Sequence, residues 1–161
     1  MKPYDAIISL LKTNDISYEE IEHKPVSTSE EAAAVRGLSM KEGAKSLLIK
    51  AGSTFYLLII PGDRRLDSKK VKKLLSVKSF RFATPEEVVS VMKCEIGSCY
   101  PFGEIIHIEH YVDSSFSENE YISFNPGVHT KSIRMRWVDY STLIGAKITL
   151  LTQEVAGKET S

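Results

Sequence analysis

The stretch from residue 44 to residue 63 reads AKSLLIKAGSTFYLLIIPGD. Two apolar runs flank the pair Gly52-Ser53, a pattern typical of a turn between neighbouring antiparallel strands. We therefore expect a β-hairpin with strands at residues 44–50 and 54–60, ended by Pro61-Gly62-Asp63. Because Leu47, Leu48 and Ile49 follow one another without a polar interruption, the first strand is expected to be buried.

Helical and strand patterns alternate on both sides of this hairpin. Helices are expected at residues 3–12, after a capping box at 28–31 as far as Gly37, at 67–75, after a second capping box at 84–87, and after a cap at Asp139. Further strands are expected at residues 18–23, 79–83, 104–109, 121–124 and 132–137. The strands are too close in sequence for a purely parallel sheet, so the pattern predicts a single mixed α/β domain. We place this domain at residues 1–150 and a C-terminal tail at 151–161.

The composition is that of an ordinary globular protein of one domain. Hydrophobic residues make up 42% of the 161 residues and charged residues 26%. The 21 basic and 21 acidic residues cancel, so no overall charge would draw the chain to DNA or to a membrane. There is no apolar run long enough to span a bilayer, no signal-peptide pattern, and too few cysteines for a disulfide framework. We therefore expect a cytoplasmic protein with no DNA or membrane partner.

A local concentration of positive charge lies between residues 64 and 81. Asp67 is its one acidic residue, and eight residues are basic: Arg64, Arg65, Lys69, Lys70, Lys72, Lys73, Lys78 and Arg81. A basic stripe on one helix can neutralise nucleic-acid phosphates without a basic total charge. The alternative is a solvated helix face, because a run of charge is weak evidence of binding.

Metal-dependent and thiol-dependent chemistry are two further possibilities. The four histidines and two cysteines do not show the paired spacing of a zinc site, so we expect neither a metal nor an organic cofactor. Cys99 lies in a loop rich in glycine and proline, where a thiol activated by a histidine could act as a nucleophile. Most cysteines are instead small apolar residues, and the sequence places no histidine beside Cys99.

A lysine and two glycine turns offer a different kind of site. Lys45 opens the first hairpin strand, so its stem would be held by rigid backbone. The turns at residues 97–101 and 125–129 could direct backbone N–H groups at a ligand. A fixed ammonium and backbone donors stabilise an ester carbonyl whose oxygen gains negative charge. The alternative is a lysine that only extends its charge into solvent from a strand end.

These segments resemble the YbaK/ProX editing family. The resemblance rests on five short segments that keep the family's order between about His23 and Leu143: EHKPVST (22–28), GAKSLL (43–48), PGD followed by Leu66-Asp67 (61–67), GSCYPFG (97–103) and FNPG (124–127). It implies a mixed, partly closed β-sheet flanked by helices. It also implies hydrolysis of the ester that joins an incorrect amino acid to the terminal adenosine of a tRNA.

The resemblance assigns roles to particular residues. The family's important lysine corresponds to Lys45, which is the candidate catalytic residue. The glycine of its Gly-x-x-x-Pro loop corresponds to Gly97, and Gly97 and Pro101 are candidate substrate-binding residues. The late glycine turn contains three further candidate substrate-binding residues, Asn125, Gly127 and His129. His129 is displaced from the position of the family's histidine, so the resemblance gives it no role. Deacylases that act on alanine often have Phe-His-Pro in this turn, whereas this chain has Phe124-Asn125-Pro126, so the branches directed to cysteine, serine or threonine stay open.

The sequence is therefore consistent with two functions. In the first, the chain is a deacylase that acts in trans on mischarged tRNA, with tRNA-Pro or a related tRNA as substrate and an aminoacyl-tRNA synthetase as an additional candidate partner. In the second, it is a non-catalytic module that binds tRNA or a synthetase. Turnover at substoichiometric protein distinguishes the two.

Overall fold

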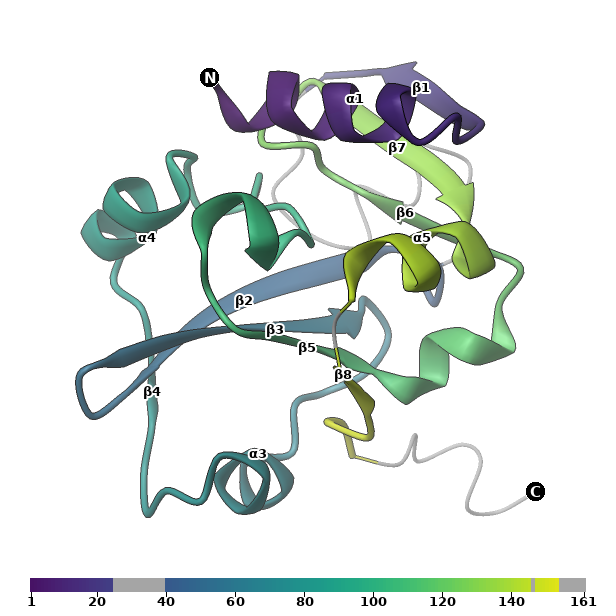
Figure 1. Cartoon of the computed structure of the whole chain (residues 1–161). Helices are drawn as coiled ribbons and strands as arrows, with labels where there is room; N and C mark the ends of the chain where they lie inside the picture. The colour runs from purple at the N-terminus through teal and green to yellow at the C-terminus, as the bar shows by residue number, and fades with distance from the viewer. Residues whose placement is uncertain (25–39, 146, 154–161) are drawn as a thin grey trace.

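The computed structural model describes residues 1–24, 40–145 and 147–153. The expected capping box at 28–31 and its closing Gly37 lie outside these residues. Within them, two β-sheets pack together with helices around them, which confirms the mixed α/β class (Figure 1). No helix in this part of the chain is both long and apolar enough to cross a membrane.

The expected hairpin forms the centre of a five-stranded sheet with the order β4-β2-β3-β5-β8. β2 (Ala44–Ala51) pairs with β3 (Thr54–Pro61) in uninterrupted antiparallel register. On the other side of β2 lies β4 (Arg81–Phe82), also antiparallel. β5 (His110–Asp113) and β8 (Lys147–Thr149) extend the sheet in parallel from β3.

A second sheet of three antiparallel strands covers one face of the first. Its order is β1 (Tyr18–Glu22), β7 (Lys131–Arg136) and β6 (Tyr121–Phe124). A parallel bridge between Gly43 and Ser123 connects it to the start of β2. This bridge partly closes the two sheets around a common interior, as expected.

The apolar run of the hairpin is explained by burial on both faces. Leu57 and Ile59 of β3 lie in the main core between the two sheets, whereas Leu58 and Ile60 lie in a second core on the opposite face. A strand covered on both faces has no solvent side, so it shows no polar alternation.

Helices cover both cores. α1 (Pro3–Thr13), α4 (Pro85–Met92) and α5 (Trp137–Ile144) contribute buried side chains to the main core. α3 (Ser68–Leu75) packs on the opposite face of the five-stranded sheet, at the bottom of Figure 1. Asp67 caps α3 by accepting bonds from the backbone N–H groups of Lys69 and Lys70. The capping box that opens α4 is formed as predicted.

Two sequence expectations are wrong. Residues 104–109 do not form a strand: the chain makes the 3-10 helix η1 (Gly103–Ile106), and the strand follows at β5. The turn is closed by backbone bonds from His107 to Glu104 and from Ile108 to Gly103. Asp139 does not cap α5, because the helix already begins at Trp137 and Asp139 lies in its first turn.

The C-terminal segment is folded as far as the structure describes it. Leu151 and Thr152, which open the expected tail, are fully buried. Backbone bonds join residues 151 and 153 to the loop before α3. Residues 154–161 lie outside the described part. The second 3-10 helix, η2 (Ser114–Glu118), follows β5 directly.

Candidate active site

Two segments that are distant in sequence meet where two glycine turns approach each other. The Asn125 Nδ2 donates a hydrogen bond to the Gly97 carbonyl oxygen at 2.9 Å. Gly97 has φ +96°, and a Cβ atom at this position would lie 3.2 Å from Cε1 of His129. We call Gly97, Asn125 and His129 the turn cluster. The structure thus brings together three of the residues predicted from sequence.

The loop that carries Gly97 is anchored at its far end by two buried tyrosines. Tyr100 donates to the Met92 carbonyl oxygen at 2.6 Å, and Tyr140 donates to the Pro101 carbonyl oxygen at 2.7 Å. Burial raises the pKa of Tyr100 and of Tyr140, so both hydroxyls stay protonated as donors. Pro101 itself is buried, whereas Gly97 is exposed. The loop is therefore held firmly behind an accessible glycine.

Gly127 supports the same loop from the other turn. It has φ +85°, and a Cβ atom there would lie 3.1 Å from Cβ of Pro3 and 3.5 Å from Cδ1 of Tyr100. A side chain at this position would therefore be strained and crowded. Gly127 lets the late turn pack closely against α1 and the Gly97 loop.

The turn cluster exposes one imidazole and contains one unused acceptor. His129 Nε2 lies 3.3 Å from the Glu95 carboxylate, and its side chain is partly exposed. Asn125 Oδ1 is buried and has no hydrogen-bond partner in the described structure. The direction of the Asn125 amide is fixed, because the Gly97 carbonyl requires a donor.

The structure places Lys45 apart from the turn cluster. Lys45 lies on the same face of β2 as Leu47 and Ile49, because residues two apart on a strand share a face. Leu47 and Ile49 pack on the α3 side of the sheet. Its Nζ donates to the Arg64 carbonyl oxygen at 3.4 Å. Burial of the ammonium lowers the pKa of Lys45, with Asp63 opposing this shift and Arg65 adding to it. Lys45 is thus a desolvated cation beside the start of the basic stripe.

Part of that basic stripe is used within the protein. Lys70 forms an ion pair with Asp67 at 3.1 Å, and Arg81 forms one with Glu87 at 2.7 Å. The Arg64 Nε donates to the Thr152 hydroxyl at 2.8 Å. No ion pair is described for the other five basic residues, Arg65, Lys69, Lys72, Lys73 and Lys78. Within residues 1–24, 40–145 and 147–153, these five cations have no carboxylate partner.

The two cysteines contact each other rather than a histidine. Cys94 Sγ and Cys99 Sγ lie 3.7 Å apart as free thiols. The contact with Cys94 and burial both raise the pKa of Cys99, which favours the unreactive thiol over the thiolate. No described histidine forms a hydrogen bond with Cys99. This geometry does not support a cysteine nucleophile.

The family model for the aminoacyl-tRNA editing domain matches residues 23–143. This region contains Lys45, the turn cluster, Pro101 and Gly127. The chain belongs to the aminoacyl-tRNA editing domain family. This is the family that the ordered segments resemble.

Curated relatives of this editing domain agree with that membership, and a solved structure shares its fold. A proline–tRNA ligase of Bacillus licheniformis is 37% identical over 95 residues, but the aligned part covers 59% of this chain and only 17% of the ligase. The multifunctional Ser/Thr-tRNA deacylase ProXp-y of Escherichia coli is 25% identical over 142 residues, 85% of each chain. A crystal structure described as a candidate trans-editing enzyme for prolyl-tRNA synthetase matches with a TM-score of 0.83 over 96% of this chain and 99% of that one, at 24% identity.

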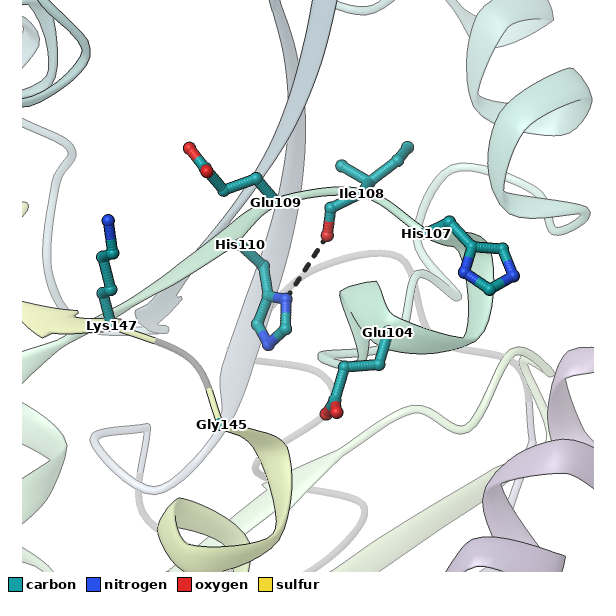
Figure 2. Close-up of a pocket in the computed structure, with 7 residues that line it drawn as sticks. All are labelled: Glu104, His107, Ile108, Glu109, His110, Gly145 and Lys147. Atoms are coloured by element: carbon teal, nitrogen blue, oxygen red, sulfur yellow. Dashed lines mark hydrogen bonds between the residues drawn. The ribbon is translucent and has the colours of Figure 1, made fainter.

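The editing domain also has an open pocket of about 480 Å³ that contains none of the site residues predicted from sequence (Figure 2). It is lined by Glu104, His107, Ile108, Glu109, His110, Gly145 and Lys147. The His110 ring packs on Gly103, where a Cβ atom would lie 2.5 Å from Nδ1. The glycine after Pro101-Phe102 is therefore required by packing. In the described residues, no three His, Cys, Asp or Glu side chains gather as a metal site would require.

Proposed function

We propose that this editing domain is a deacylase that hydrolyses the ester between an incorrect amino acid and the terminal adenosine of tRNA. The observation that carries the proposal is the meeting of Gly97, Asn125 and His129 within the region matched by the family model. An exposed glycine with positive φ lets a ligand approach the backbone closely. We assign the acyl group of the substrate to this place.

The turn cluster would hold and orient the ester. Asn125 fixes the Gly97 carbonyl and thereby the conformation of the loop, and His129 lies beside the glycine as a partly exposed polar group. Pro101 and Gly127 act indirectly, by anchoring the loop and by allowing the two turns to pack. Water attacks the ester carbonyl, the tetrahedral intermediate collapses, and the ribose oxygen of tRNA leaves with a proton.

Lys45 would act through its charge. Its position beside Arg64, Arg65 and α3 supports contact with a phosphate near the scissile ester, rather than with the acyl group in the turn cluster. A desolvated ammonium attracts an anion more strongly than a solvated one, because less water screens the interaction. The gain is largest where negative charge develops during the reaction.

The amino acid and the tRNA can be identified with one panel of substrates. We propose a small amino acid, Ala, Cys, Ser or Thr, attached to tRNA-Pro or a related tRNA, and action in trans in the cytoplasm, with a synthetase as an additional candidate partner. Support comes from the ProXp-y relative, which is named for Ser/Thr-tRNA, and from the prolyl-tRNA ligases. The experiment measures release of each amino acid from each mischarged tRNA. Release from none of them would reject the proposal.

The basic residues of α3 are expected to bind the tRNA backbone. Reversing the charge of Lys69, Lys72 and Lys73 together should raise the apparent Michaelis constant about tenfold or more at moderate salt, with a smaller effect on turnover. Wild-type binding should also weaken steeply with salt, and the variant should show a shallower slope. Steady-state kinetics and binding at several salt concentrations measure both effects.

The matched control reverses three exposed lysines outside the stripe, Lys12, Lys41 and Lys147. It produces the same change in net charge at different places. Equal loss of binding in the two variants would show that only the total charge matters. Unchanged binding in the α3 variant would mean that the stripe is a solvated helix face.

Cys99 is not expected to take part in the reaction. Cys99→Ser should retain most of the deacylation activity, because the thiol is protonated and contacts Cys94. Single-turnover deacylation of the wild type and the variant, with and without a thiol-alkylating reagent, provides the measurement. Complete loss of activity in the folded variant would establish a thiol mechanism instead.

A further inference from the structure

The loop that presents the hydrogen-bond partner of Lys45 is fastened to the C-terminal segment. The Asp67 N–H donates to the Leu151 carbonyl at 2.8 Å, and the Gln153 N–H donates to the Arg65 carbonyl at 2.9 Å. Residues 65–67 and 151–153 thus run side by side as a short antiparallel pair. Because the two segments are more than 80 residues apart in sequence, no local pattern predicts this contact.

Thr152 stands at the centre of this pair. It is fully buried, and its hydroxyl accepts a hydrogen bond from Arg64 Nε at 2.8 Å. The same hydroxyl lies 3.2 Å from each carboxyl oxygen of Asp113. A hydroxyl has one proton and a guanidinium only donates, so Thr152 must donate to Asp113 while it accepts from Arg64. The three side chains therefore form a directed chain of hydrogen bonds.

Asp113 fixes the inner end of this chain. It is fully buried at the end of β5, and its carboxyl oxygens also accept from the Leu151 N–H at 2.7 Å and from the N–H and hydroxyl of Ser115. A buried carboxyl group is costly unless its oxygens are hydrogen-bonded, and here both are. The rigid sheet thus sets the position of Thr152, and Thr152 sets that of Arg64.

We propose that Asp113 and Thr152 are positioning residues for Lys45. They hold Arg64 so that its carbonyl oxygen receives the Lys45 ammonium and so that Arg65 and α3 stand beside it. The inference rests on the proposed function, since it assigns the chain of hydrogen bonds to the substrate side of the deacylase. Asp113 and Thr152 are not catalytic residues, because their described contacts are with other parts of the protein.

The position of this chain of hydrogen bonds indicates a role beyond stabilising the core. A buried Asp–Thr pair could be satisfied within the core, but here Thr152 reaches a half-buried arginine at the base of the basic stripe. The backbone of that arginine is the acceptor for Lys45. Loss of the Thr152 hydroxyl would therefore release the Arg64 side chain at the point where the loop meets Lys45, while the backbone bonds between the two segments remain.

The test compares Thr152→Val with Thr152→Ser. Valine keeps the shape but removes the hydroxyl, whereas serine keeps the hydroxyl. Thr152→Val is expected to lower kcat/KM for deacylation about tenfold, and Thr152→Ser to remain within about threefold of the wild type. In a Lys45→Ala background, Thr152→Val should cause little further loss, because residues that act through one another are not additive. Thr142→Val, at an exposed threonine on α5, is the matched control.

A second readout does not depend on deacylation. Lys45 titrates with a lowered pKa because its ammonium is partly desolvated. Without the bond to Thr152, the Arg64 side chain can move, and water should reach the Lys45 ammonium. Thr152→Val should therefore move the pKa of Lys45 upward, toward the ordinary lysine value. NMR of the lysine side chains measures this shift. If the wild type deacylates no substrate, the proposed function fails, while this titration still decides the positioning role.

Either of two results with Thr152→Val would overturn the inference. One is a Thr152→Val protein that is less stable but leaves both kcat/KM and the Lys45 titration unchanged. The other is an equal loss of activity with and without Lys45. If Thr152→Val does not fold, Arg64→Met removes the same hydrogen bond, together with the bond from Arg64 Nη2 to the Gln153 carbonyl oxygen at 3.4 Å, and keeps the aliphatic stem. It should shift the Lys45 titration in the same direction, and an unchanged titration in this variant would also reject the proposal.

Discussion

Replacing Lys45 with alanine is expected to slow single-turnover deacylation by about two to three powers of ten. The ammonium is partly desolvated, which strengthens its attraction for a phosphate near the scissile ester. Its described hydrogen bond is a single one, to the Arg64 carbonyl at 3.4 Å, so the fold should survive its removal. Lys45→Arg should restore little activity, because a planar guanidinium does not replace a compact ammonium.

Lys50→Ala is the matched control for this prediction. Lys50 lies on the same strand, is also partly buried, and forms an ion pair with Glu87 at 3.8 Å on the far side of the hairpin. The control should keep its activity, with circular dichroism confirming that both variants are folded. Equal rates for Lys45→Ala and the wild type would remove Lys45 from the mechanism.

Gly97→Ala is the second change expected to have a large effect. Alanine at φ +96° is strained, and its Cβ would lie 3.2 Å from Cε1 of His129. The loop and the imidazole must move apart, which also disturbs the hydrogen bond from Asn125. Since a displacement of about 1 Å near the reacting groups can cost about 100-fold, we expect deacylation to fall by about 10- to 100-fold.

Gly52→Ala separates the backbone strain from the effect on the site. Gly52 forms the tip of the β2–β3 hairpin with φ +61°, and a Cβ atom there would meet nothing within 4 Å. Both variants should lower the melting temperature, because alanine at positive φ costs about 1 kcal/mol. Only Gly97→Ala should lose activity. Similar activity in both would show that the Gly97 loop does not contact the substrate.

Local patterns predicted much of the fold. The hairpin, the strands at β1 and β6, the Asp67 cap and the second capping box depend on residues that are neighbours in sequence, and the structure confirms them. The expected strand at 104–109 failed because its three isoleucines suit either a strand or a short helix. The close packing of His110 on Gly103 is a tertiary contact that no local pattern contains. β8 was missed because three residues pairing with distant β5 give no periodicity.

The candidate site, like the fold, was predictable from the sequence only in part. The two glycine turns are recognisable in sequence because positive φ demands particular residues, and the structure brings their Gly97, Asn125 and His129 together. The surroundings of Lys45 were not predictable. Its position beside Arg64, and the bond from Arg64 to Thr152, join segments that are far apart in the chain.

The most direct test of the central claim counts the ester bonds cleaved by each protein molecule. The measurement follows amino-acid release from the mischarged tRNA that the panel identifies, with the protein at a concentration well below that of the tRNA. We predict many releases per protein molecule in the wild type and almost none in folded Lys45→Ala over the same time. Saturable tRNA binding without release above the uncatalysed rate would contradict the account and would favour a non-catalytic binding module.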